Sequence, residues 1–127
     1  MKAVREIVDK TIAQHAPEWK VLSDEARPDV LDRITVRISN KSFRRLPEAP
    51  LGWYQHTVNI RLVSHLDDIA RAEFDLEAAV DSLISIIEQY LVPVLDATWS
   101  EAEKVLDPDT NNLAWDIPVL INSERKA

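Results

Sequence analysis

The three histidines, His15, His56 and His65, are the residues best suited to acid–base or metal chemistry in this chain of 127 residues. No two of them have the four-residue spacing that places two metal ligands on one face of a helix. His65 precedes Asp67 and Asp68, so it could act as a base with carboxylate partners. We interpret this group instead as a strand-end histidine beside a helix-capping acid. The sequence therefore predicts no metal site and no cofactor.

Two short segments resemble parts of metal-dependent nucleases, namely Pro28-Asp29 and Glu124-Arg125-Lys126. In such enzymes two carboxylates hold the ion and a lysine orients the attacking water. The second segment stands among the final residues, where a backbone is usually too frayed to position a metal ligand. A chain with a single glycine also cannot form the Gly-x-Ser-x-Gly elbow of serine hydrolases. We therefore expect a protein that is not an enzyme.

Size and composition favour one globular domain over residues 1–127. Hydrophobic residues make up 46% of the chain, and four of them are tryptophans. No apolar run reaches the roughly 18–20 residues of a membrane span, and the N-terminal residues do not have the pattern of a secretory signal. The formal net charge of −7 opposes tight binding to nucleic acid, because such binding depends on neutralising phosphates.

The charge is distributed unevenly along the chain. Residues 33–46 contain only basic charged residues, whereas residues 67–88 contain seven acids and one arginine. Opposite surfaces of this kind guide how two protein partners meet and are oriented. The basic segment comprises Arg33, Arg37, Lys41, Arg44 and Arg45.

Two helices are predicted from apolar residues at helical spacing. The first covers about residues 2–15 and ends before Pro17. The second runs from about residue 68 to 91, is capped by Asp67 or Asp68, and stops at Pro93. Its apolar stripe comprises Ile69, Ala72, Leu76, Ala79, Val80, Leu83, Ile87 and Tyr90.

Strand patterns surround these helices, and the segments near 19–22, 34–39, 53–66, 98–106 and 113–122 are the candidates. The break at 46–52 predicts a hairpin loop, with a polar loop at 24–29 and a turn at 107–112. Pro118 makes the last strand either a sheet edge or a strand whose proline nitrogen points away from any neighbour. The predicted fold class is α+β: a mostly antiparallel, four- to five-stranded sheet, carrying an N-terminal helix, a long central helix and a projecting β-hairpin.

The aromatic residues Trp53 and Tyr54 follow the hairpin loop directly. Trp19, Trp99 and Trp115 are expected to fill the core, whereas Trp53 would stand beyond the part of the hairpin that the helices cover. Aromatic residues at a projecting strand end are enriched at interfaces, and a local cap on the sheet is the alternative. We therefore include both residues in a candidate interface.

Several parts of the chain together suggest a family. They are the segment 47–79, which includes Pro50-Leu51-Gly52-Trp53-Tyr54 and the strand 58–65, the segment 99–105, and Ala114-Trp115-Asp116-Ile117. In this pattern the chain resembles the tail terminator proteins of long-tailed (siphovirus-type) bacteriophages. The resemblance implies a hexameric ring that caps the head-proximal end of the tail tube, stops tube polymerisation and forms the interface to the head connector.

The same resemblance implies partners and a location. The partners are further copies of this chain, the tail tube protein and the head-tail connector protein, with DNA only passing through the pore. The location is the virion tail, after assembly in the host cytoplasm. The alternatives are another phage neck or tail-completion protein and, in a different class, a small cytoplasmic ligand-binding module.

A ring requires a head-to-tail contact between two different surfaces of one subunit. The basic strand and the acidic helix could supply these surfaces. We expect the basic side chains to face Asp75 or Asp81 on the helix of the next subunit. The basic side chains in this hypothesis are Arg37, Arg44 and Arg45.

Overall fold

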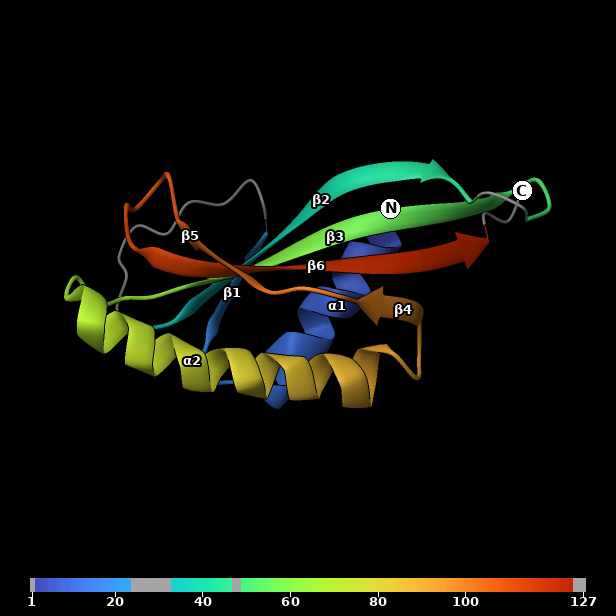
Figure 1. Cartoon of the computed structure of the whole chain (residues 1–127). Coiled ribbons are helices and arrows are strands. Elements are labelled where there is room, and N and C mark those ends of the chain that lie inside the picture. Colours follow the sequence, from blue (N-terminus) through green and yellow to red (C-terminus); the bar gives the residue numbers. More distant parts are fainter. Residues whose placement is uncertain (1, 24–32, 47–48, 125–127) are drawn as a thin grey trace.

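In the part of the chain that the structure describes, a mixed β-sheet forms one layer and two helices form the other (Figure 1). The structure is a computed structural model that describes residues 2–23, 33–46 and 49–124. The predicted loop at 24–29, part of the loop at 46–52 and the basic end of the nuclease-like segment 124–126 lie outside these residues. No described helix is long and apolar enough to span a membrane.

Within the described residues the sheet has six strands in the order β1-β2-β3-β6-β4, and β5 also pairs with β6. β1 is parallel to β2, and the other pairs are antiparallel. The predicted α+β class and the mostly antiparallel sheet are confirmed, but the expected four to five strands were too few. The strands are β1 (Lys20–Ser23), β2 (Thr35–Arg45), β3 (Trp53–Val63), β4 (Asp96–Trp99), β5 (Glu103–Leu106) and β6 (Leu113–Glu124).

The strand expected at 98–106 is divided into β4 and β5, and the cause lies opposite it in β6. β4 pairs with residues 119–122 of β6, and β5 pairs with residues 113–116. Pro118 lies in the gap between these two ladders, where a residue without an N–H loses no sheet hydrogen bond. Of the two alternatives for this strand, the sheet edge is excluded, because β6 lies inside the sheet between β3 and the β4–β5 side.

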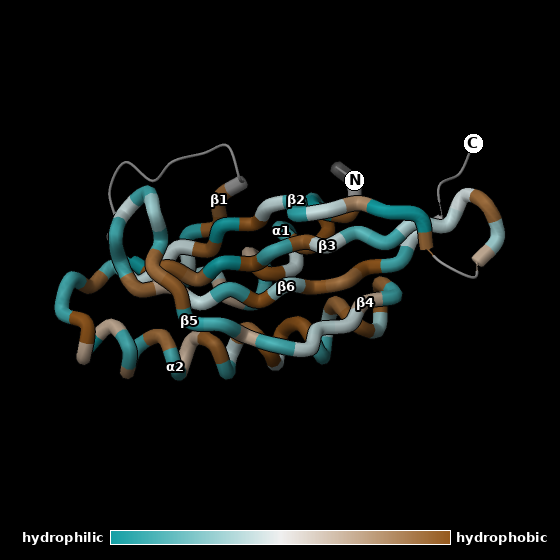
Figure 2. Tube along the Cα trace, turned by 45° about the horizontal axis from the view of Figure 1, so that its top comes forward, coloured by the Kyte–Doolittle hydropathy of each residue, from teal (hydrophilic) through white to brown (hydrophobic). Residues whose placement is uncertain are grey.

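The helices lie on one face of the sheet. Helix α1 spans Lys2–His15, and helix α2 spans Ile69–Ile86 and continues into one π-helical turn, η1 (Ile87–Leu91). Asp68 caps α2, because its Oδ1 accepts hydrogen bonds from the backbone N–H groups of Ala70 (3.0 Å) and Arg71 (3.4 Å). Apolar and polar positions alternate along α2 with the helical turn, as Figure 2 shows.

The core lies between the two layers. Val36, Ile60 and Ile117 from the sheet and Ile12 and Leu83 from the helices are almost inaccessible to solvent. Both ends of the stripe predicted for the second helix were wrong, because Ile69 is 66% exposed and Tyr90 is 40% exposed. Tyr90 instead stacks on His15 of α1, with ring centroids 3.6 Å apart. No helix of the described residues covers the opposite face of the sheet (Figure 1).

The β2–β3 hairpin projects past the end of α2 (Figure 1). Asn40 pairs with Val58 and Ser42 pairs with Thr57, so Lys41 is the extra residue of a β-bulge. Gly52 closes the loop at φ 95°, a backbone conformation that a side chain would strain. This hairpin confirms the projecting hairpin of the predicted fold.

Candidate functional site

The helix-free face of the sheet carries a network of ion pairs. Arg61 on β3 binds Asp116 on β6 through two hydrogen bonds, Nε to Oδ1 at 2.6 Å and Nη2 to Oδ2 at 2.8 Å. Its Nη1 also donates to Asp107 at 3.2 Å. The Asp107 carboxylate, which is 0% exposed, accepts from the backbone N–H (3.1 Å) and the hydroxyl (2.8 Å) of Thr110. The network therefore ties the 107–112 turn to the middle of the sheet.

Arg37 belongs to the same network. Its Nη1 donates to Asp107 at 3.4 Å and to Asp109, and the arginine side chain is only 13% exposed. We expected Arg37 to face an acid of a neighbouring subunit. In this structure the guanidinium binds acids of its own chain, and a contact with a neighbouring subunit stays a prediction. Thr35, two residues before Arg37 on the same strand, is buried as well.

The ion pairs shift the proton equilibria of the groups that form them. Burial by itself would raise the pKa of Asp116, but hydrogen bonds from Arg61 and Asn59 and the charges of Arg61 and Lys41 outweigh it and lower that pKa. The hydrogen bond to Asp116 raises the pKa of Arg61 despite the opposing effect of burial. Both groups stay charged near neutral pH. Among the described residues, these ion pairs join two arginines and three aspartates, whose formal charges sum to 2 − 3 = −1.

The two arginines at the end of β2 lie on opposite faces of the hairpin. Arg44 lies on the helix-free face, where its Nε donates to Oε1 of Gln55 at 2.9 Å. Gln55 in turn donates to Asn122 at 3.2 Å, and Asn122 donates to Asp96 at 3.3 Å. These side chains form a polar ladder across four strands. Arg45 pairs in register with Tyr54, on the face that is continuous with the core.

The other candidate aromatic residues also lie on the hairpin. Tyr54 stacks on Phe43 with ring centroids 4.8 Å apart, and Phe43 contacts the ring of His56 at 5.0 Å. Trp53 is half-buried and lies next to the loop, where its backbone oxygen accepts from Leu46 N–H at 2.9 Å. His56 is buried, and burial lowers its pKa. Phe43 is 42% exposed and was missed in the sequence, because the bulge at Lys41 changes which face it occupies.

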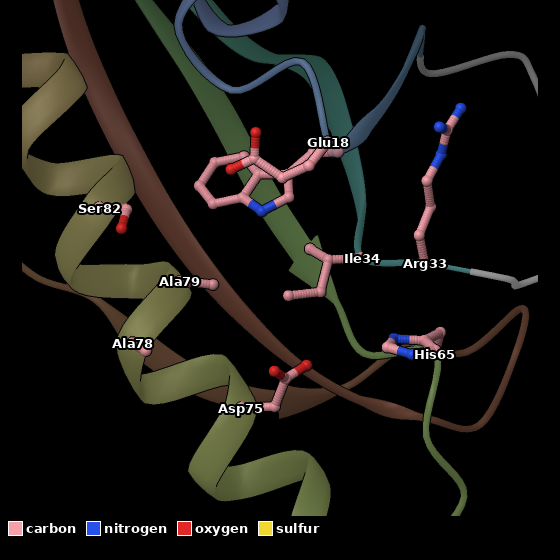
Figure 3. A pocket seen from close by; sticks show the side chains of 9 residues that line it. Glu18, Arg33, Ile34, His65, Asp75, Ala78, Ala79 and Ser82 are labelled. Carbon is pink, nitrogen blue, oxygen red and sulfur yellow. The ribbon is translucent and has the colours of Figure 1, made fainter.

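The two candidate acids of α2 differ in their surroundings. Asp81 is exposed, as a solvated helix face requires. Asp75 is half-buried and lines a hollow of about 350 Å³ between α2, Trp19 and His65. Its Oδ2 and the Nδ1 of His65 are buried atoms without a hydrogen-bond partner among the described residues. Figure 3 shows both side chains pointing into this hollow from opposite sides.

One further ion pair connects helix α2 to strand β5. Glu73 accepts from Lys104 at 2.6 Å, so the helix is anchored to β5 by a partly exposed ion pair. Within residues 2–23, 33–46 and 49–124, no three side chains of the types His, Cys, Asp or Glu lie close enough together to hold a metal ion.

Comparison with known proteins adds no family. The sequence matches no profile of a known protein family, and a search of curated proteins finds no similar sequence.

Proposed function

We propose that this protein is a virion structural protein that caps the head-proximal end of a phage tail tube as a hexameric ring of identical chains. In this role it stops tube polymerisation, contacts the tail tube protein and forms the interface to the head-tail connector protein. The proposal starts from the resemblance to tail terminators. The observation that carries it further is the presence of two different exposed surfaces at opposite ends of one subunit.

The first surface is the projecting hairpin, where Phe43 and Arg45 are exposed. The second is the N-terminal half of α2, where Ile69 and Phe74 are 66% and 81% exposed. Large exposed apolar side chains that gather at two separate places are typical of interaction sites. A closed ring is built by repeating one contact between two unlike surfaces, so this arrangement is what a ring subunit requires.

Electrostatics also supports the proposal. The whole chain has a formal charge of −7, and both arginines of the ion-pair network on the helix-free sheet face are paired with aspartates. A surface with surplus negative charge does not hold phosphates, so DNA can slide past it without being bound. This property suits a pore through which the genome passes.

A small ligand-binding module is the second candidate, and the hollow beside Asp75 and His65 is the observation that favours it. Its two buried polar atoms without partners could bind a small polar ligand. The hollow is rimmed by exposed side chains of Glu18, Arg33 and Ser82. Small-molecule sites usually enclose most of the ligand surface, so an open hollow fits a protein partner better.

The test is deletion of the gene from the phage or prophage that carries it, followed by electron microscopy of the particles. Over-long tails without heads support the terminator role. Tails of normal length that fail to join heads point instead to another neck or tail-completion protein. Normal, head-joined tails reject both. A plasmid copy of the gene that restores normal tails controls for effects on neighbouring genes.

A further inference from the structure

The projecting hairpin carries a patch that combines aromatic and basic side chains. We call Phe43, Arg45 and Tyr54 the hairpin patch. Their positions in the β2–β3 register place them on the sheet face that the helices cover elsewhere, but the hairpin extends beyond those helices (Figure 1). Aromatic and arginine side chains are the residue types that contribute most binding energy in protein interfaces. Arg45 is exposed, and no hydrogen bond or ion pair of its side chain with a described residue is observed.

A groove lies at the other end of the molecule, along the first turns of α2. Leu66, Ala70, Arg71, Phe74 and Asp75 line a hollow of about 380 Å³, which we call the α2 groove. Asp75 also lines the neighbouring hollow that it shares with His65. One residue thus connects two adjacent depressions on the same side of α2.

Two buried polar atoms in these depressions have no hydrogen-bond partner among the described residues. A buried carboxylate oxygen without a hydrogen-bond donor bears the full cost of its desolvation, and this cost is larger when the group is charged. The Asp75 Oδ2 atom is in that situation among the described residues, and Nδ1 of His65, which lines the same hollow, has no partner there either. An incoming guanidinium would supply both charge and donors. Arginine suits this role because its planar group can donate two parallel hydrogen bonds to one carboxylate.

We propose that the hairpin patch of one copy of this chain docks into the α2 groove of a second copy. In this contact the Arg45 guanidinium pairs with the Asp75 carboxylate, and Phe43 packs on Phe74. The two surfaces lie at opposite ends of a subunit, so they cannot meet within one chain (Figure 1). The contact is head-to-tail, and its repetition either closes a ring or extends a filament. The view that this contact joins the subunits of a ring rests on the proposed function. Whether two copies bind each other in this way can be tested separately.

Charge favours the hairpin patch of a second copy as the occupant of the α2 groove. Residues 67–88 carry seven acids and one arginine, and the hairpin strand 33–46 has no acid. Arg37 is already held by Asp107 and Asp109, and Arg44 is held by Gln55. Of the three arginines within β2 (Thr35–Arg45), Arg45 is therefore the one best placed to reach a neighbour.

The absence of cysteine from the chain allows a clean crosslinking test. We would make Arg45→Cys and Ala70→Cys as separate proteins, mix them at high concentration and add a short bismaleimide crosslinker. We expect covalent heterodimers in the mixture, and a ladder of longer products from the double variant. Lys10→Cys, on an exposed position of α1, replaces Arg45→Cys in the control mixture. Heterodimer yield no higher than in this control would overturn the proposal, and efficient crosslinking of one variant with itself would indicate a symmetric contact instead.

Charge exchange provides a second measurement that does not depend on a cysteine. Arg45→Asp and Asp75→Arg should each weaken self-association by about tenfold or more in sedimentation equilibrium, and the double variant should recover much of that loss. Thermal unfolding of each variant shows whether it is folded. No recovery in folded variants would contradict the pairing. If the copies crosslink as expected but the gene deletion leaves normal tails, the contact stands and the terminator role fails. If the copies do not crosslink but the deletion gives over-long tails without heads, only the contact is rejected.

Discussion

Replacement of Asp107 by alanine should destabilise the protein strongly, because this buried carboxylate joins the 107–112 turn to two strands. It accepts hydrogen bonds from Thr110 N–H (3.1 Å), Thr110 Oγ1 (2.8 Å), Arg61 (3.2 Å) and Arg37 (3.4 Å). Its side chain has no solvent exposure that would let water replace these bonds.

The size of the effect follows from the four bonds. Each bond from Thr110 should contribute about 1 kcal/mol. The arginines lose less, about 0.5 kcal/mol each, because they are partly exposed and keep Asp116 and Asp109 as partners. We therefore expect Asp107→Ala to lower the free energy of unfolding by about 3 kcal/mol, which corresponds to a melting temperature lower by about 10 °C.

Urea denaturation followed by tryptophan fluorescence measures this difference, provided that the slope of the transition is unchanged. Asp109→Ala is the matched control in the same turn, because its side chain is 31% exposed; it should cost about 0.5 kcal/mol. If both variants lose the same small amount of stability, Asp107 does not hold the turn, and the reasoning from buried hydrogen bonds is wrong.

Three further outcomes can be measured in the same way. Leu76→Ala, at a fully buried position, should cost about 2–5 kcal/mol in urea denaturation, whereas Phe74→Ala on the exposed side of the same helix should stay within about 0.5 kcal/mol. Equal losses would contradict the assigned helix faces. Asp68→Ala removes the cap of α2 and should cost about 1 kcal/mol; an unchanged midpoint would show that the cap contributes nothing. Burial lowers the pKa of His56, so the unfolded state binds the proton more readily, and stability should be complete above about pH 6.5 and fall as the pH drops below it. His56→Gln should show a smaller loss of stability between about pH 7 and pH 5; an identical loss would exclude His56 as the cause.

The fold was predictable where one local pattern determined the structure. Periodicity located both helices, and alternation located β2 and β3, because a half-buried element must repeat apolar residues at its own period. A cap at Asp67 or Asp68 followed from two acids just before an apolar helix, and Asp68 is the one that caps it in the structure. The position of β6 inside the sheet could not be predicted from the sequence. A strand that contains Pro118 can have neighbours on both sides only if the partner strand is interrupted opposite the proline, and such a gap is a property of the tertiary structure.

The candidate interface was only partly predictable for a related reason. The sequence shows that Arg37 and Asp75 carry charge, but it does not show which groups already form ion pairs or hydrogen bonds with them. Arg37 is satisfied by residues about 70 positions away in the chain, whereas Asp75 has a buried oxygen without a partner. Asp107 was assigned only to a turn. The Asp-Pro-Asp-Thr-Asn composition indicated that turn, but it did not indicate that the first acid is fully buried beneath two arginines.

The most direct measurement of the central proposal is tube length in a purified system. Tail tube protein from the phage that carries this gene would be allowed to polymerise with and without added protein, and tube lengths would be measured by electron microscopy. Addition of this protein should shorten the tubes and leave extra density at one end of each tube. Arg45→Asp, if it remains folded, should lose much of this effect. An unchanged length distribution, with no density at the tube ends, would contradict the assignment of this chain as a tail terminator.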